Sequence, residues 1–248
     1  GGSYYVCSGA VINNTNHDCT PYILTAWHCG EHTANQNLSG YTWYWSYQKS
    51  NCQPNNNGSD PSKGNQTMIN GAVRSSSGSG TLNNPPGDNQ MKGSDFSLIE
   101  LNSNIPQSYN AFYAGWDRGS SLKSSGVSIH HPNGSAKKIS TFDSNLQSQS
   151  YNGGAFNAHW MVSWSETVNG HGVTEGGSSG SPIFDQNKKI VGQLSGGSSE
   201  CDYPNDPDLY GKFSKNWVDN GSSEGAQLAP WLDPNGTNLT DIEGIYFS

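Results

Sequence analysis

Short runs of aromatic and β-branched residues recur along this chain, and each is bounded by a cluster of Gly, Asn, Pro or Ser. Such runs are typical of β-strands that end in turns, and long helical periodicity is absent before residue 225. The pattern therefore predicts a closed all-β architecture. The expected strands cover residues 22–27, 41–47, 96–101, 127–130, 159–164, 182–184, 190–194 and 209–213.

The length of 248 residues fits two small β-barrels packed against each other. We expect the boundary near residues 106–109, which gives domains at 1–107 and 108–248. Residues 225–232 are expected to form a short C-terminal helix, with Leu228, Trp231 and Leu232 on one face. The polar, glycine-rich segments 53–66 and 75–93 are expected to be surface loops of the first domain.

The composition limits the possible partners. Apolar residues make up 31% of the chain, but eight Trp, twelve Tyr and seven Phe supply enough bulky surface for a core. A net charge of -8 argues against nucleic acid, which would need clustered Lys and Arg. No apolar run approaches the roughly 18–20 residues of a membrane span, and no signal peptide is visible. We expect a mature, processed chain with no membrane or nucleic-acid partner.

Three segments carry residues that could work together in catalysis. A His beside a Cys follows an apolar run at 25–29, an Asp opens another apolar run at 94–99, and a Gly-Ser-Ser-Gly-Ser-Pro elbow lies at 177–182. A serine needs a base to become a nucleophile near neutral pH, and the base needs an acid that holds its tautomer. The order His, Asp, Ser is that of chymotrypsin-like proteases. The sequence therefore predicts a serine endopeptidase.

From about Cys7 to Leu232, the chain resembles the secreted bacterial lysyl endopeptidases of the chymotrypsin fold. Besides the elbow, the resemblance rests on Leu-Thr-Ala-Trp-His-Cys-Gly at 24–30, Ala-Gly-Trp-Asp-Arg at 114–118 and Ile-His-His-Pro-Asn at 129–133. It implies two six-stranded antiparallel barrels with the active site in the cleft between them. The first barrel would carry the catalytic His and Asp. The second would carry the catalytic Ser and the specificity pocket, and would end in the short helix.

The resemblance also implies a role for each catalytic residue. Ser179 is the expected nucleophile, His28 the general base and Asp95 the acid that orients His28. The backbone N–H groups of Gly177 and Ser179 would form the oxyanion hole. No metal or cofactor is expected to take part.

Neighbouring residues compete for these roles. Ser178 and Ser181 flank the expected nucleophile, and the adjacent His130 and His131 could serve as a base, although we interpret both as structural. Trypsin buries its N-terminal amine against an aspartate just before the nucleophile, where this chain has Ser178. Active-site order should therefore not depend on a free N-terminus of that kind.

The expected specificity pocket differs from that of trypsin. Trypsin-like enzymes carry the pocket acid six residues before the nucleophile, and Val173 stands there in this chain. Lysyl endopeptidases carry it just before a Tyr-Gly on a later strand, and Asp208 matches that position. The alternative is that Asp208 belongs, with the nearby acids Glu200, Asp202 and Asp206, to a solvated loop or a calcium site.

Two departures from the family fall among the expected substrate-binding residues. Tyr151 stands where the family has a tryptophan, and Ser195 where it has a histidine that stacks on that tryptophan. Their loss puts strict selection of Lys over Arg in doubt. Gly196 and Gly197 complete the expected substrate-binding set, with Asp208.

Five cysteines without a CxxC pair indicate disulfides in an exported protein. The resemblance implies a Cys7–Cys29 bridge that holds the His28 turn. We also expect Cys19–Cys52, because the strands that carry these regions should be neighbours in the first barrel. Cys201 is expected to be unpaired, since its family counterpart bonds to an N-terminal segment that this chain lacks.

Three functions remain open. The leading one is a secreted, extracellular bacterial endopeptidase that acts as a monomer and cleaves proteins or peptides after Lys, with Arg as a second site. An endopeptidase of the same fold with acidic or broad preference would follow if Asp208 faced solvent. A non-catalytic, protease-like binding domain is the third, although such domains usually lose a member of the triad and this chain keeps all three.

Overall fold

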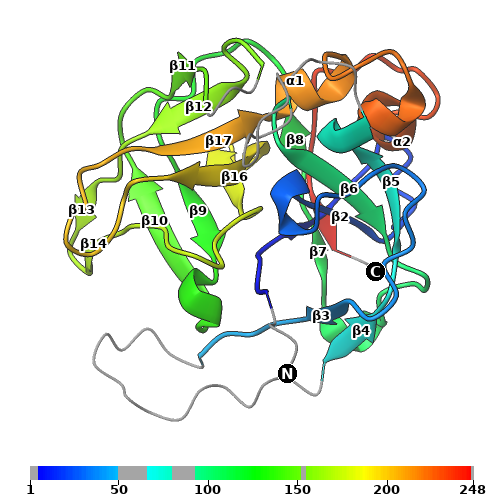
Figure 1. Ribbon diagram of the computed structural model, residues 1–248, viewed down its shortest axis with the longest axis horizontal. Coiled ribbons are helices and arrows are strands. Elements are labelled where there is room, and N and C mark those ends of the chain that lie inside the picture. Colours follow the sequence, from blue (N-terminus) through cyan, green and yellow to red (C-terminus); the bar gives the residue numbers. More distant parts are fainter. Residues whose placement is uncertain (1–4, 50–65, 80–92, 152–154, 247–248) are drawn as a thin grey trace.

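The computed structural model describes residues 5–49, 66–79, 93–151 and 155–246 (Figure 1). Strands dominate, and the only α-helices in these ranges are α1 (Phe213–Val218) and α2 (Ala229–Leu232). The all-β prediction is therefore confirmed. Helix α2 lies within the predicted helical segment 225–232, whereas α1 was not predicted. No helix among the described residues is long and apolar enough to cross a membrane.

The first half of the chain forms a four-stranded antiparallel sheet. All of its apolar strand residues except Ala10, Val11 and Ala72 are buried. In sheet order, the strands are β1 (Ala10–Ile12), β2 (Tyr22–Ala26), β6 (Phe96–Glu100) and β5 (Ala72–Ser76). Beside this sheet lies the hairpin of β3 (Thr42–Tyr44) and β4 (Thr67–Ile69).

The second half forms a nine-stranded sheet. Its central path is β10 (Lys138–Phe142), β9 (Gly126–His130), β15 (Pro182–Asp185), β16 (Ile190–Gly197), β17 (Asp208–Lys212), β12 (His159–Val162) and β11 (Gln147–Gln149). Strand β8 (Trp116–Asp117) joins β16, and β18 (Asp241–Ile242) joins β8. The hairpin of β13 (Glu166–Thr167) and β14 (Gly170–His171) stands apart from this sheet. Among the described residues, no strand pairing closes either sheet into a six-stranded barrel.

The predicted strands agree with the observed ones, and the loops between them contain five 3-10 turns among the described residues. These turns are η1 (Trp27–Cys29), η2 (Ser77–Ser79), η3 (Gln107–Tyr109), η4 (Pro132–Gly134) and η5 (Glu224–Ala226). The predicted loop 75–93 begins inside β5, and most of its remainder lies outside the described residues, as does nearly all of 53–66.

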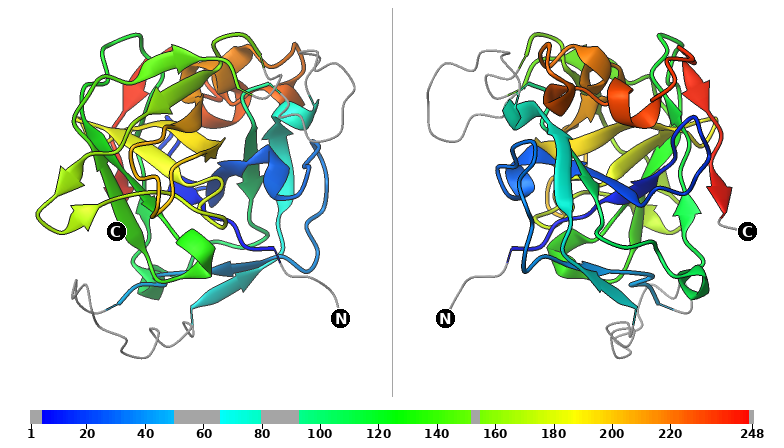
Figure 2. Two further views of the ribbon diagram at one scale, coloured as in Figure 1. Left: turned by 60° about the vertical axis from the view of Figure 1, so that its left-hand side comes forward. Right: turned by 90° about the vertical axis from the view of Figure 1, so that its right-hand side faces the viewer.

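The C-terminal segment runs along one side of the molecule (red in Figure 2) and pairs with strands from the middle of the sequence. Strand β18 pairs with β8, and β19 (Ile245–Tyr246) pairs with β7 (Phe112–Tyr113). Strand β7 in turn lies beside β1, where the Asn13 N–H donates to the Ala114 carbonyl at 2.9 Å. The expected domain boundary at residue 107 stays a prediction. The C-terminal segment helps to join the two halves, because β19 pairs with β7 and β7 lies beside β1.

A buried aromatic cluster fills the space between the halves. Trp116 is fully buried, with its ring centroid 5.4 Å from that of Phe213 and 4.7 Å from that of Trp217. Its indole N–H donates to the Asn13 carbonyl at 3.0 Å. The same apolar cluster includes Leu24 from β2. Helix α1 therefore exists because packing of Phe213 and Trp217 stabilises a segment too short to be helical alone.

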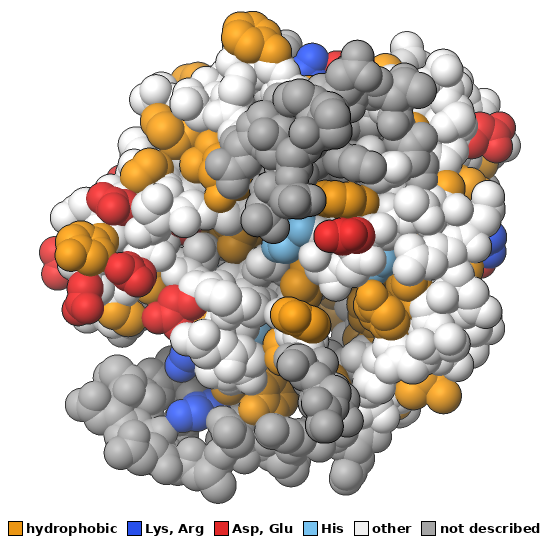
Figure 3. All heavy atoms as spheres, viewed as in Figure 1, with side chains coloured by type: hydrophobic (Ala, Val, Ile, Leu, Met, Phe, Trp, Pro, Cys, Tyr) orange, Lys and Arg blue, Asp and Glu red, His pale blue; other side chains and the backbone are white. Residues whose placement is uncertain are grey.

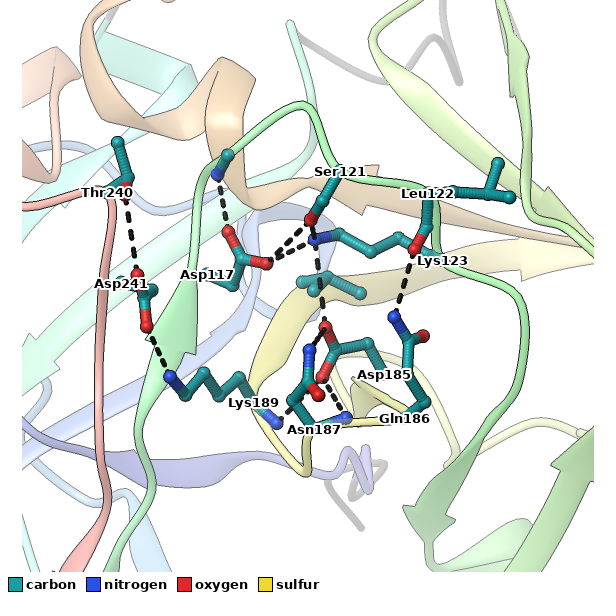
Figure 4. A network of polar contacts seen from close by, with 12 residues as sticks. Asp117, Ser121, Leu122, Lys123, Asp185, Gln186, Asn187, Lys189, Thr240 and Asp241 are labelled. Atoms are coloured by element: carbon teal, nitrogen blue, oxygen red, sulfur yellow. Dashed lines mark hydrogen bonds and ion pairs between the residues drawn. The ribbon is translucent and has the colours of Figure 1, made fainter.

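A buried ammonium group links two strands of the second half (Figure 4). The Lys123 side chain is 1% exposed and forms ion pairs with Asp117 of β8 and Asp185 of β15. Nearby, Lys189 pairs with Asp241 of β18. These pairs border a polar hollow that contains none of the predicted catalytic residues. The charges are compensated within the fold, so we interpret the network as structural.

We predict that Trp116→Ala lowers the free energy of unfolding by about 3–5 kcal/mol, because it empties a packed site and leaves the Asn13 carbonyl without its donor. Phe156→Ala is the matched control, since Phe156 is 82% exposed. It should change stability by no more than about 0.5 kcal/mol. Urea denaturation of both variants is the measurement, and equal small effects would contradict the assigned role of Trp116.

Candidate active site

The end of strand β2 positions His28. The strand stops at Ala26, and η1 turns the chain so that the His28 side chain is 27% exposed. Cys29 closes the turn through a disulfide to Cys7, with the two Cα atoms 6.2 Å apart. The predicted Cys7–Cys29 bridge is therefore present and ties the His28 turn to the segment before β1.

Asp95 meets His28 with both of its carboxylate oxygens. The side chain is fully buried, Oδ1 accepts the backbone N–H of His28 at 3.0 Å, and Oδ2 lies 2.8 Å from His28 Nδ1. Because a carboxylate only accepts, Nδ1 must carry the proton in this contact. The lone pair of the neutral ring is then on Nε2, the atom that a general base would use.

The backbone of Asp95 adopts an uncommon conformation that the surroundings hold in place. Its φ is 61°, in the left-handed region that Asp tolerates better than most residues. From the second half, Gln193 Nε2 donates to the Ser94 carbonyl at 2.8 Å, and Asn220 Oδ1 accepts the Ser94 N–H at 3.2 Å. Amide side chains of β16 and the α1 region thus fix the turn that orients Asp95.

The pKa of His28 reflects opposing effects. Burial lowers it by disfavouring the charged ring, whereas the charge of Asp95 and the hydrogen bond to it raise it. The net result is a pKa above the usual value of 6.5. The ring is therefore easier to protonate than a free histidine, as a base that must hold a proton during a reaction should be.

The serine elbow packs directly against the end of β2. Gly177 and Gly180 have φ values of 88° and 79°, which favour glycine. A Cβ at Gly180 would lie 2.2 Å from Thr25 Oγ1, so only glycine allows this approach. The Gly180 N–H donates to the Leu194 carbonyl at 2.8 Å, which joins the elbow to β16.

Of the three elbow serines, Ser179 alone is partly exposed. Ser178 is fully buried and its Oγ lies 2.8 Å from His130 Nδ1. Ser181 is fully buried as well, with its Oγ 3.4 Å from Ser128 Oγ. The Ser179 hydroxyl makes no hydrogen bond to His28 or to any other described residue. Without substrate, the distance between a catalytic serine hydroxyl and its base is often too long for a hydrogen bond, and it shortens when the substrate binds.

The two expected oxyanion-hole donors are unpaired among the described residues. Neither the Gly177 N–H nor the Ser179 N–H donates a hydrogen bond to a described residue. The carbonyl of Gly176 accepts the Asn133 N–H at 2.6 Å, and the carbonyl of Ser178 accepts the Ser181 N–H at 2.9 Å. Because a trans peptide points its C=O and N–H in opposite directions, these bonds turn both free donors away from the protein groups behind them.

His130 has a structural environment, as we expected. It is buried, and its second ring nitrogen lies 3.0 Å from Ser140 Oγ. Burial lowers its pKa to about 4, so the ring is neutral at ordinary pH. The ring of His131 packs on Tyr47, with centroids 5.8 Å apart. Neither ring forms a hydrogen bond with Ser179.

Asp208 begins β17 and lies opposite Gly197 of β16. It is fully buried and accepts hydrogen bonds from Trp164 Nε1 at 2.7 Å, Thr174 Oγ1 at 2.8 Å and Ser199 Oγ at 2.6 Å. Thr174 belongs to the loop that leads to the elbow, so the carboxylate lies beneath that loop. Burial raises the pKa of Asp208 more than these hydrogen bonds lower it.

The other acids of the predicted cluster separate from Asp208. Glu200, Asp202 and Asp206 are exposed. Within the described ranges, no group of three or more His, Cys, Asp or Glu side chains is arranged to hold a metal ion. The solvated-loop interpretation therefore fits these three residues and does not extend to Asp208.

An imidazole lies where two of the expected substrate-binding residues meet. His159 Nε2 is 3.1 Å from Ser195 Oγ, and the ring of Tyr151 meets the His159 ring edge-on, with centroids 5.6 Å apart. A Cβ at Gly196 would lie 2.8 Å from the Tyr151 hydroxyl. Sequence reasoning gave His159 no role, although its place at the start of a predicted strand could have drawn attention to it.

Cys19 and Cys201 form no disulfide with another described residue. Cys19 is half-buried and Cys201 is exposed, with its Sγ 3.6 Å from Glu175 Oε1. Cys52, the expected partner of Cys19, lies outside the described residues. The Cys19–Cys52 bridge stays a prediction.

The site as a whole lies where the two halves meet. His28 and Asp95 come from the first half, whereas the elbow and Asp208 come from the second. In the space-filling view, histidine atoms are visible near the middle of the face between the halves (Figure 3). Such an arrangement can support nucleophilic attack by Ser179 with His28 as base.

Two comparisons with known proteins agree with the resemblance found in the sequence. The family model described as "Lysyl endopeptidase, C-terminal domain" matches residues 1–211. A lysyl endopeptidase of Pseudomonas aeruginosa is 30% identical over 220 residues, which are 86% of this chain and 42% of that protein. The chain thus corresponds to less than half the length of this relative.

Among solved structures, the crystal structure of the Rv3671c protease in its inactive form aligns with a TM-score of 0.44 and 11% identity. The alignment covers 83% of this chain and 77% of that one. The family assignment depends instead on the match of the lysyl endopeptidase model, which extends over most of the sequence. On that ground the chain belongs to the lysyl endopeptidase family.

Proposed function

We propose that this protein is a serine endopeptidase that cleaves peptide bonds after Lys and also after Arg, and that it acts outside the cell. The observation that carries the proposal is the pairing of Asp95 with His28 beside an elbow whose Gly177 and Ser179 N–H groups have no partner in the described part of the chain. This is the arrangement that acyl transfer through a serine needs. The family match supports the reaction class and the extracellular setting.

In the proposed reaction, Ser179 Oγ attacks the scissile carbonyl carbon while His28 Nε2 accepts its proton. The oxygen that becomes negative is stabilised by the Gly177 and Ser179 N–H groups. His28 then gives the proton to the leaving amine, and an acyl-enzyme remains on Ser179. Water, activated by the same imidazole, hydrolyses the ester and restores the serine.

The preference for a basic residue rests on Asp208. Its carboxylate is buried, and the neighbouring donors supply only hydrogen bonds and no positive charge. A lysine ammonium entering from the substrate would provide that charge and favour the ionised carboxylate. The Tyr151 and His159 rings lie near the expected binding edge at Gly196, without the stacked pair of the family. We therefore propose that Arg is excluded less strictly than in typical members.

We predict that Ser179→Ala lowers kcat by about 10^4–10^6, because the nucleophile is removed while the oxyanion hole remains. A fluorophosphonate should label the native protein once, and peptide mapping should find the label on Ser179. A chelator should leave the rate unchanged. Label on Ser178 or Ser181 would contradict the assignment.

The rate of fluorophosphonate labelling should rise with pH and reach half its maximum above pH 6.5. The reason is that His28 must be neutral to accept a proton, and Asp95 raises its pKa. Asp95→Asn removes the negative charge, so the residual labelling rate should reach half its maximum at a lower pH than in the native protein. If the pH of half-maximal labelling is unchanged in Asp95→Asn, a group other than His28 controls the titration.

Asp208→Asn keeps the shape of the side chain and removes its charge. For cleavage after Lys, we predict that the transition-state stabilisation derived from kcat/KM falls by roughly 2–4 kcal/mol. Cleavage after Leu should fall far less. Asp206→Asn is the matched control, because Asp206 is an exposed acid two residues away. Matched Lys, Arg and Leu substrates provide the measurement. An equal fall on all three would show that Asp208 is a scaffold residue.

A further inference from the structure

The segment before β1 contacts the serine elbow through one residue, Ser8. Ser8 is 6% exposed, and its hydroxyl donates to the Gly177 carbonyl at 2.9 Å. The same oxygen accepts the backbone N–H of His131 at 3.0 Å. The backbone N–H of Ser8 donates to the Ser179 carbonyl at 2.8 Å. One small side chain and its peptide group therefore bind the chain on both sides of Ser178.

These contacts bear on the conformation of Gly177. Its φ of 88° is accessible because glycine has no Cβ, and glycine is also the residue most free to leave this conformation. The hydrogen bond from Ser8 holds the carbonyl of Gly177, while the Asn133 N–H holds the carbonyl of Gly176. The two peptide planes that flank the Gly177 Cα are thus fixed from outside the elbow, and with them the direction of the Gly177 N–H.

Ser8 is itself held firmly enough to act as such a support. Its carbonyl accepts the Thr25 hydroxyl at 2.8 Å, and the preceding Cys7 is bonded to Cys29. Through these contacts the residue is attached to the end of β2 and to the His28 turn. The disulfide and Ser8 together connect the expected base, the elbow and the 131–134 turn.

We propose that Ser8 is a positioning residue for the oxyanion hole, and that its hydroxyl keeps the Gly177 N–H directed at the developing oxyanion. The inference rests on the proposed function. Loss of the hydroxyl would leave the Gly177 carbonyl and the His131 N–H without their partner. The loop could then regain hydrogen bonds only by turning one of its peptides, which would misalign the donor.

Ser8→Ala tests this proposal directly. Its kcat should fall on the order of 10–100-fold with little change in KM, because a displaced donor weakens contacts made mainly in the transition state. Affinity for a peptide aldehyde, which forms a hemiacetal oxygen in the hole, should fall by the same factor. Affinity for a peptide with a reduced CH2–NH bond at the scissile position should stay unchanged, because that ligand has no carbonyl there.

Two further variants control the experiment. Ser75→Ala removes a fully buried hydroxyl of β5 that has no hydrogen-bond partner among the described residues, and it should leave kcat unchanged. Ser8→Thr keeps a hydroxyl and should recover most of the lost rate. Thermal unfolding of each variant checks that the rates belong to folded protein.

The outcomes separate this proposal from the proposed function. If fluorophosphonate does not react with Ser179 in the native protein, the proposed function is wrong and the inference falls with it. If the native protein reacts but folded Ser8→Ala keeps its kcat, only the role of Ser8 is wrong. Equal weakening of the aldehyde and the reduced peptide would likewise overturn it, because Ser8 would then support substrate binding in general.

Discussion

The buried carboxylate of Asp95 is the constraint on which the site depends. It accepts two hydrogen bonds from His28, and this leaves His28 Nε2 as the basic atom. Holding a carboxylate fully buried is costly unless donors surround it, and the His28 turn supplies them. The left-handed backbone at Asp95 is the geometric condition for this contact, and amide side chains of the second half maintain it.

The same principle recurs at the elbow and at Asp208. In each place an uncommon backbone or a buried charge is stabilised by hydrogen bonds from distant parts of the chain. The carbonyls of residues 176–179 are bound by Asn133, Ser8 and Ser181, and the Asp208 carboxylate is bound by Trp164, Thr174 and Ser199. The site is therefore organised before any substrate arrives, which is the condition for effective electrostatic stabilisation.

The sequence predicted the strands well wherever aromatic and β-branched residues dominate, as in β2, β6 and β16. It missed β5 and β10, in which residues such as Ser75 and Ser140 are polar yet buried. It also missed α1, because Phe213 continues a strand pattern and the helix is stabilised only by packing. The chemistry of the expected triad could be predicted from local motifs. Ser8 could not, because its partners lie far along the chain and hydrogen bonds over such separations leave no local pattern.

The hydrogen bonds that join Gln193 and Asn220 to Ser94 determine what happens to the site when the two halves begin to separate. Docking of the two halves and alignment of the acid with its base are a single event, since neither side of the contact is complete alone. A molecule whose halves begin to separate would lose the alignment of Asp95 with His28 as the aromatic cluster between the halves becomes exposed. Under the proposed function, intact copies could cleave such a molecule, and it could not cleave them in return.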